Sequence, residues 1–131
     1  FMPQLYQLAN AFVLPSRGEG WGRPHVEAMS MALPVIATGW SGPTEYIRDG
    51  YNGYLIEVDG LEPIEEGAFK GHEWATPSVE DLKQLMRFSY EHPEYVKNII
   101  GKNAQIDMRR KYCIECIGKL LEQKLRSMTS Q

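Results

Sequence analysis

Two carboxylates, Glu19 and Glu27, bracket a glycine-rich stretch with seven residues between them. The stretch holds glycines at positions 18, 20 and 22, which let a backbone approach a ligand closely. A helix is predicted to begin at Pro24, and the free amides at a helix start can hold phosphate. If the loop folds back, both carboxylates can face one pocket and accept hydrogen bonds from a ligand.

Each carboxylate also has an ordinary structural interpretation. Glu27 lies four residues after Arg23 and can form an ion pair with it on the predicted helix. A capping-box role for Glu27 is disfavoured, because position 24 is proline rather than Ser or Thr. Glu19 can be a solvated loop charge. Spacing alone therefore leaves a ligand-binding pair and two structural carboxylates both open.

Short apolar runs predict the elements that position this stretch. The unbroken run 11–14 predicts a strand buried on both faces, and residues 26–32 predict the helix that follows. Further strands are predicted at 35–38 and 54–56, with a helical turn at 44–47 between them. Alternating strands and helices indicate a parallel sheet with right-handed crossovers. The predicted fold class is α/β, a partial doubly wound (Rossmann-like) parallel sheet of about three strands with flanking helices and a helical C-terminal tail.

The rest of the chain is predicted to be irregular first and helical afterwards. Residues 58–77 combine turn residues with acids and predict an irregular excursion. Apolar stripes at helical spacing follow over 79–90, 93–100 and 114–128, and we expect each stripe to be core. We expect one domain over residues 1–131, made of an α/β segment (1–57), an irregular loop (58–77) and a helical segment (78–131).

A longer pattern surrounds the two carboxylates. It reads Pro15-Ser16-x-x-Glu19-Gly20-Trp21-Gly22-x-Pro24-x-x-Glu27-Ala28-Met29, then Leu33-Pro34-Val35-Ile36-Ala37-Thr38, Ser41-Gly42-Pro43-x-Glu45 and Gly50-x-Asn52-Gly53-Tyr54-Leu55-Ile56. This pattern, with its E-x7-E pair, resembles the donor-site segment of glycosyltransferase family 4. The likeness is close over residues 3–56 and loose beyond them. Two positions depart from the commonest form, since Trp21 replaces Phe and Arg23 replaces an apolar residue.

The resemblance implies the two-domain GT-B architecture, of which this chain supplies half of the C-terminal domain. It implies retaining transfer of a sugar from a nucleotide-diphosphate sugar to a sugar or glycolipid acceptor. Glu19 is then the catalytic candidate, because it lies in the loop near the reacting sugar, and Glu27 takes the ribose hydroxyls. The other donor-binding candidates are Ser16, Gly20, Trp21, Gly22 and Arg23. The resemblance implies no metal, and we expect no cofactor besides the substrate.

Other polar residues near the loop keep two interpretations each. Arg17 either touches phosphate or faces solvent. His25 is more simply a packing histidine than a ligand contact. Residues Ser41 to Pro43 are expected to shape the loop beneath the nucleotide, the alternative being a plain turn.

The family's acceptor-binding N-terminal domain and its diphosphate-binding basic residues lie outside this chain. Phe1 also follows no initiator Met, so we expect a piece of a longer enzyme that is inactive alone. The main alternative is a non-catalytic nucleotide-sugar binding or regulatory module. A flavodoxin-like receiver is disfavoured, because neither of the first two predicted strands ends in a phosphorylatable Asp.

Composition limits the function classes. The chain has 131 residues, 43% apolar and 24% charged, as is typical of a soluble globular domain. Its net charge of −3 gives no sign of a nucleic-acid partner. Residues 1–77 hold 4 Lys/Arg against 10 Asp/Glu, whereas residues 78–131 hold 10 against 7. We expect a cytoplasmic protein with solvated charged faces, and peripheral contact with an anionic membrane stays open as the alternative.

The two cysteines have the spacing C-x-x-C, at Cys113 and Cys116. A zinc site needs two more ligands than this pair supplies. A redox motif normally opens a helix after a strand, and here a helical stretch precedes it. We therefore expect idle thiols within a helix.

The predicted strand 11–14 lacks a neighbour on one side, since the first half of a doubly wound sheet is outside the chain. An unpaired apolar edge favours pairing with a second copy. We expect a homodimer through strand 11–14, the last helix (114–128), or both. The alternative is a monomer whose terminal helices cover the edge.

Overall fold

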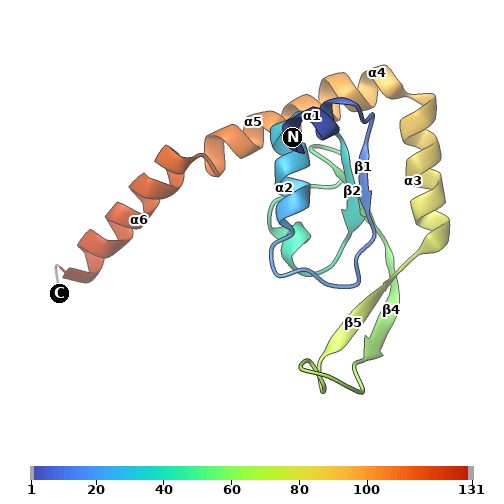
Figure 1. Ribbon diagram of the computed structural model, residues 1–131, viewed down its shortest axis with the longest axis horizontal. Helices are drawn as coiled ribbons and strands as arrows, with labels where there is room; N and C mark the ends of the chain where they lie inside the picture. The colour runs from blue at the N-terminus through green and yellow to red at the C-terminus, as the bar shows by residue number, and fades with distance from the viewer. Residues whose placement is uncertain (1, 130–131) are drawn as a thin grey trace.

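A computed structural model describes residues 2–129 and arranges them around a parallel sheet (Figure 1). The sheet has three strands in the order β1 (Phe12–Leu14), β2 (Val35–Thr38) and β3 (Tyr54–Ile56). All pairs are parallel, with Ile36 of β2 opposite both Val13 and Tyr54. The predicted α/β class and its parallel sheet are confirmed. Residues 1, 130 and 131 of the predicted domain lie outside the described part.

The central strand β2 is buried along its whole length. Successive side chains of a strand point to opposite faces of the sheet. Val35 and Ala37 join an apolar cluster with α2 (Arg23–Ser30) and α5 (Lys102–Lys111). Ile36 joins a second cluster, against which α3 (Val79–Glu91) packs. Helices therefore cover both faces of the sheet, as an unbroken apolar strand requires (Figure 1).

The other helical elements are α1 (Met2–Gln7), the 3₁₀ turn η1 (Gly42–Glu45), α4 (Pro93–Tyr95), the π-helical η2 (Val96–Gly101) and α6 (Ile114–Thr129). Pro93 begins a helix as predicted, and Val96 and Ile100 are buried. The expectation that Ile99 also points inward is wrong, because its side chain is 47% exposed. A π-helical turn bonds i to i+5 and so changes which positions share a face.

Residues 58–77 are not irregular, so that prediction is wrong. They form an antiparallel hairpin of β4 (Val58–Pro63) and β5 (Glu73–Pro77), which extends away from the sheet (Figure 1). Near its tip Trp74 and Phe69 pack edge to face, with ring centroids 6.1 Å apart. β4 is almost wholly exposed, so it carries no alternating apolar signal, and a proline is tolerated in such an edge strand.

The last helix leaves the body of the molecule (Figure 1). Its apolar stripe was expected to be core, yet each member is exposed: Ile114, Ile117, Leu121, Leu125 and Met128. The stripe on α3 is only partly packed, since Leu82 and Leu85 meet the core while Val79, Met86 and Tyr90 stay exposed. Among residues 2–129, no helix is long and apolar enough to cross a membrane.

A buried carboxylate ties α5 to the turn before β3. Asp107 Oδ2 accepts hydrogen bonds from Arg48 Nη2 at 2.7 Å and from Asn52 Nδ2 at 2.8 Å. Asn52 also donates to the Tyr46 carbonyl at 3.0 Å. Burial opposes ionisation of Asp107, but the hydrogen bonds from Arg48 and Asn52, with the charge of Lys111, outweigh it. The pKa of Asp107 is therefore held below its usual value.

Replacing Asp107 by Asn tests this tie. The folded-state pKa of Asp107 is lowered, so its stabilisation is present above the unfolded pKa of about 3.9 and is lost as the pH falls through the folded value. We expect Asp107→Asn to lower the free energy of unfolding at pH 7 by about 1.5–3 kcal/mol. The difference in the free energy of unfolding between the variant and wild type should decrease as the pH falls. Denaturant unfolding from pH 7 down to pH 3 measures it.

The matched control is Glu122→Gln on α6, which removes an exposed ion pair with Arg126. Exposed pairs on a helix contribute only about 0.3–0.5 kcal/mol. A gap between Asp107→Asn and wild type that stays constant with pH would show that the loss comes from packing rather than from the charge.

Candidate functional site

The glycine-rich loop joins β1 to α2 at the carboxyl end of the sheet. It ends at Gly22, the N-cap of α2, whose φ of 82° lies in the left-handed region. A side chain there would be strained and would press on His25 and Tyr46. The helix begins at Arg23 with Pro24 second, one residue earlier than predicted.

A second loop, after β2, holds the first in place. Ser41 Oγ and the Gly42 N–H both donate to the carbonyl of Glu19, at 2.6 and 2.9 Å. A Cβ at Gly42 would lie only 2.6 Å from the Gly20 carbonyl oxygen, so only glycine allows this approach. Ser41 itself has a φ of 62°, an uncommon conformation for a residue with a side chain. Residues 41–43 therefore shape the glycine-rich loop rather than forming a plain turn, and their position beneath a nucleotide stays a prediction.

Two tyrosines that the sequence did not single out also support the loop. The Tyr46 hydroxyl donates to the Trp21 carbonyl at 2.6 Å, and the two rings are 5.0 Å apart. Burial, followed by the charge of Glu19, raises the pKa of Tyr46 and keeps it a neutral donor. Tyr112 packs edge-on against Trp21 at 5.5 Å. The sequence shows only that both residues are aromatic, and this does not reveal which residues their rings contact.

His25 is fully buried and packs edge-on against Phe12 at 5.6 Å. Burial lowers its pKa, so the ring is neutral, and Nδ1 lies 3.2 Å from the Gly22 carbonyl that accepts its hydrogen. Its Nε2 has no partner within residues 2–129. The interpretation of His25 as a packing histidine is confirmed.

Glu19 lines a hollow of about 370 Å³ between the two loops and the hairpin. Its walls include Gly20, Trp40 and Ser41 from the loops, and Ile64, Phe69, His72 and Trp74 from the hairpin. The hairpin walls were missed because that segment was expected to be irregular.

Arg17 fixes the hairpin to the loop, and its side chain remains 46% exposed, in line with the solvent-facing interpretation. Its backbone carbonyl accepts from the Ala75 N–H at 2.9 Å, and its Nε donates to the Ala75 carbonyl at 3.2 Å. Its Nη2 forms an ion pair with Glu62. The guanidinium is therefore engaged by the hairpin.

Glu27 lines a different hollow, of about 340 Å³, between α1 and α2. Its Oε2 accepts from the Tyr6 hydroxyl at 3.1 Å, and its Oε1 lies 3.8 Å from Arg23 Nη2. Burial, with the bond to Glu27, raises the pKa of Tyr6. The expected ion pair with Arg23 is confirmed.

In the described residues the two carboxylates line different hollows, whereas the spacing also allowed a single shared pocket. Glu27 lies one turn into α2, on the side facing α1, whereas the Glu19 loop turns toward the hairpin. The start of α2 lies between the two hollows.

The remaining candidates lie along the loop and the helix start. Within residues 2–129, the backbone N–H groups of Gly20, Trp21 and Gly22 have no hydrogen-bond acceptor. Trp21 is 39% exposed and the Arg23 side chain 86%. Ser16 is half-buried, and its hydroxyl makes no hydrogen bond in the described part of the chain. No group of three His, Cys, Asp or Glu residues there could hold a metal ion.

The fold and the position of the loop define the class of protein. In open α/β sheets, ligands bind beyond the carboxyl ends of the strands, and amides at the next helix start hold anionic groups. The loop between β1 and α2 has this position, and its amides are unpartnered. The chain belongs to the glycosyl transferases group 1 family, whose sequence profile matches residues 2–68, just over half of its length.

Known proteins resemble the chain over most of its length. It is 31% identical over 117 residues to the probable sucrose-phosphate synthase 1 of Craterostigma plantagineum, which covers 83% of this chain. A solved C-terminal domain of a glycosyl transferase group 1 family protein (LpcC) from Francisella tularensis is 26% identical, with a TM-score of 0.65 over 86% of this chain. Anabaena HepE, solved with UDP-glucose, shares the fold at 24% identity, with a TM-score of 0.72 over 96% of this chain.

The chain matches only part of each of these proteins. It spans 11% of the Craterostigma protein, 48% of the Francisella domain and 30% of the HepE chain.

Gly42→Ala tests whether the second loop holds the first. The new Cβ would meet the Gly20 and Glu19 carbonyl oxygens, so the loop around residues 18–22 must shift. We expect a loss of about 1–3 kcal/mol in the free energy of unfolding, as is typical of overpacking, and faster hydrogen exchange at the position 42 N–H, which donates to the Glu19 carbonyl.

Gly60→Ala in β4 is the matched control, because a Cβ there meets nothing within 4 Å. Equal exchange of the position 42 N–H in the two variants would mean that the contact between the loops does not hold the first loop.

Proposed function

We propose that this chain is the donor-binding part of a retaining family 4 glycosyltransferase of GT-B architecture. The enzyme would transfer a sugar from a nucleotide-diphosphate sugar to a sugar or glycolipid acceptor. The observation that carries the proposal is the match of residues 2–68 to the family, because this segment contains both carboxylates and the unpartnered amides between them. The UDP-glucose complex of HepE, which has the same fold, supports this donor class.

The unpartnered amides suit the leaving group of this reaction. Departure of a nucleoside diphosphate places negative charge where preorganised donors can stabilise it without reorganisation. Gly20, Trp21 and Gly22 offer such N–H groups at the positive end of α2. Arg23 adds a mobile positive charge at the same end. In this proposal the donor needs no metal or other cofactor.

Two separate hollows fit one extended donor better than they fit a compact ligand. A nucleotide sugar lying across the start of α2 reaches the Glu19 hollow with its sugar and the Glu27 hollow with its ribose. Glu27 is already held by Tyr6, so its carboxylate is oriented before the ribose arrives. Ser16, half-buried before the loop, lines the approach to the phosphates in this arrangement.

The proposal includes partners for the chain. An N-terminal domain supplies the acceptor site, so the 131 residues are inactive alone. Within the described residues, β1 pairs only with β2, and the α6 stripe is uncovered, which supports pairing of isolated chains as a homodimer. In this proposal the enzyme is cytoplasmic, and it can contact a membrane surface peripherally.

Glu27→Ala in the full-length enzyme tests the ribose role. Removing a carboxylate that accepts ligand hydrogen bonds should cost about 1.5–3 kcal/mol, or about 10- to 150-fold in donor affinity. The measurements are donor KM and the affinity for the free nucleoside diphosphate. The control is Glu80→Ala, a helical glutamate on α3 that also pairs with a basic neighbour, which should change neither. Unchanged donor affinity in Glu27→Ala would refute the assignment.

Glu19→Gln tests the catalytic role. A group that interacts more strongly with the transition state than with the bound donor affects kcat more than KM. We therefore expect kcat to fall while donor KM changes little. If donor KM rises while kcat stays unchanged, Glu19 contacts the bound donor and does not act in the transition state.

A further inference from the structure

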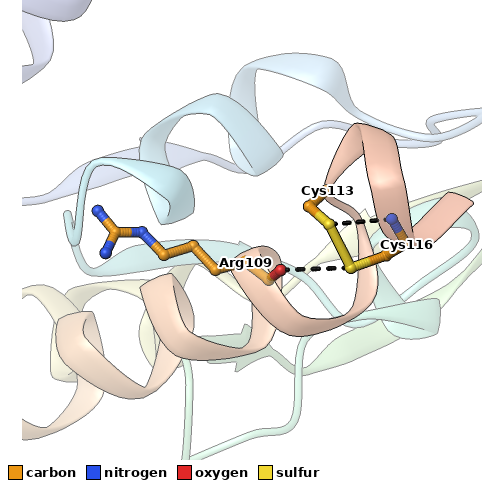
Figure 2. Close-up of a disulfide and its surroundings, with 3 residues drawn as sticks. All are labelled: Arg109, Cys113 and Cys116. Atoms are coloured by element: carbon orange, nitrogen blue, oxygen red, sulfur yellow. Dashed lines mark hydrogen bonds between the residues drawn. A yellow bond between two sulfur atoms is a disulfide. The ribbon is translucent and has the colours of Figure 1, made fainter.

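The two cysteines are not idle thiols, so that expectation is wrong. Cys113 and Cys116 are joined by a disulfide at the junction of α5 and α6 (Figure 2). Their Cα atoms are 5.0 Å apart, within the range that a disulfide needs. The sequence argued against a redox pair because a helical stretch, not a strand, precedes the cysteines. The structure nevertheless places the pair at the start of a helix.

Cys113 occupies the N-cap position of α6. Its carbonyl accepts the first helical hydrogen bond, from the Ile117 N–H at 2.9 Å. Its Sγ accepts from the Cys116 N–H at 3.0 Å, the bond that a Ser or Asp side chain makes at an N-cap (Figure 2). After reduction, this N–H and the positive end of the helix stabilise a thiolate at Cys113.

Cys116 has a partner suited to the reduced state. Its Sγ lies 3.6 Å from the Arg109 carbonyl oxygen (Figure 2). A disulfide sulfur has no proton, so only the thiol can donate a hydrogen bond to this oxygen. Reduction therefore gives Cys116 a hydrogen-bond acceptor and removes the crosslink that fixes its position relative to Cys113. Both cysteines are half-buried, which leaves them within reach of a thiol from solution.

The pair is linked to the glycine-rich loop through Tyr112, the residue before Cys113. The Tyr112 ring packs edge-on against Trp21 at 5.5 Å and Tyr46 at 6.5 Å. Tyr46 in turn donates to the Trp21 carbonyl. A change in the backbone at Cys113 therefore reaches the loop through one aromatic contact.

We propose that Cys113 and Cys116 form a reversible dithiol–disulfide pair, and that its state sets the mobility of the glycine-rich loop through Tyr112. The reductant is a low-molecular-weight thiol or a protein dithiol. Its thiolate attacks Cys116 Sγ, the S–S bond breaks, and Cys113 leaves as the stabilised thiolate. A second reductant thiolate then attacks the reductant's sulfur in the mixed disulfide, and Cys116 leaves as a thiolate. Two electrons pass to the pair, the reductant leaves as a disulfide, and both cysteines end as thiols after protonation.

The first test measures exchange directly. The full-length protein is equilibrated at graded ratios of reduced to oxidised dithiothreitol, quenched in acid and alkylated. The tryptic peptide 112–119 carries both cysteines, so its mass separates doubly labelled from unlabelled protein. We expect the ratio of the two forms to change tenfold for each tenfold change in the dithiothreitol ratio. A peptide that is alkylated at every ratio, or protected at every ratio, would overturn the proposal.

The second test measures the link to the loop and does not depend on the proposed function. Hydrogen exchange is compared between oxidised and reduced protein at the Gly42 N–H, whose hydrogen bond to the Glu19 carbonyl holds the loop, with peptides of α3 as the internal control. We expect reduction to speed this exchange by about two- to tenfold, the size that one aromatic pair supports. The double variant Cys113→Ser/Cys116→Ser should match the reduced protein under both conditions. Equal exchange of the Gly42 N–H in the two redox states would overturn the link.

Discussion

The Glu19 carbonyl, fixed by two hydrogen bonds from the second loop, is the constraint on which this site depends. Those bonds from Ser41 and Gly42 bring two backbone segments so close that no side chain fits at position 42. These bonds hold the loop before α2, and the N–H groups of Gly20, Trp21 and Gly22 have no acceptor within residues 2–129. Unpartnered donors are costly unless water or a ligand satisfies them, so a loop fixed in this way is preorganised for an anion.

The constraint also explains why the two carboxylates diverge. Gly22 adopts a left-handed conformation, and α2 begins at the next residue. Glu27 therefore lies on the helix, on the side that faces α1. Glu19 stays behind in the loop and faces the hairpin. The seven residues between Glu19 and Glu27 therefore place the two carboxylates on different sides of the start of α2, not on opposite walls of one pocket. A ligand that contacts both carboxylates must be long, which agrees with a nucleotide sugar.

Features that repeat locally in the sequence could be predicted, and features made by distant contacts could not. The sheet followed from apolar runs such as 35–38, because a strand buried on both faces needs no other signal. The hairpin at 58–77 was missed because β4 is exposed and β5 is held by Arg17 from another segment. The disulfide was missed because the spacing C-x-x-C is equally compatible with free thiols.

The support of the loop by Tyr46 and Tyr112 has a wider consequence. Tyr112 lies 91 positions after Trp21 in the chain, yet its ring contacts the loop directly. The rigidity of the glycine-rich loop therefore depends on where the segment between α5 and α6 lies. That segment is tied to the body by Asp107 on one side and continues into the uncovered α6 on the other. A displacement of this segment would disturb the packing of Tyr112 against Trp21, so the order of the glycine-rich loop depends on contacts made far away in the chain.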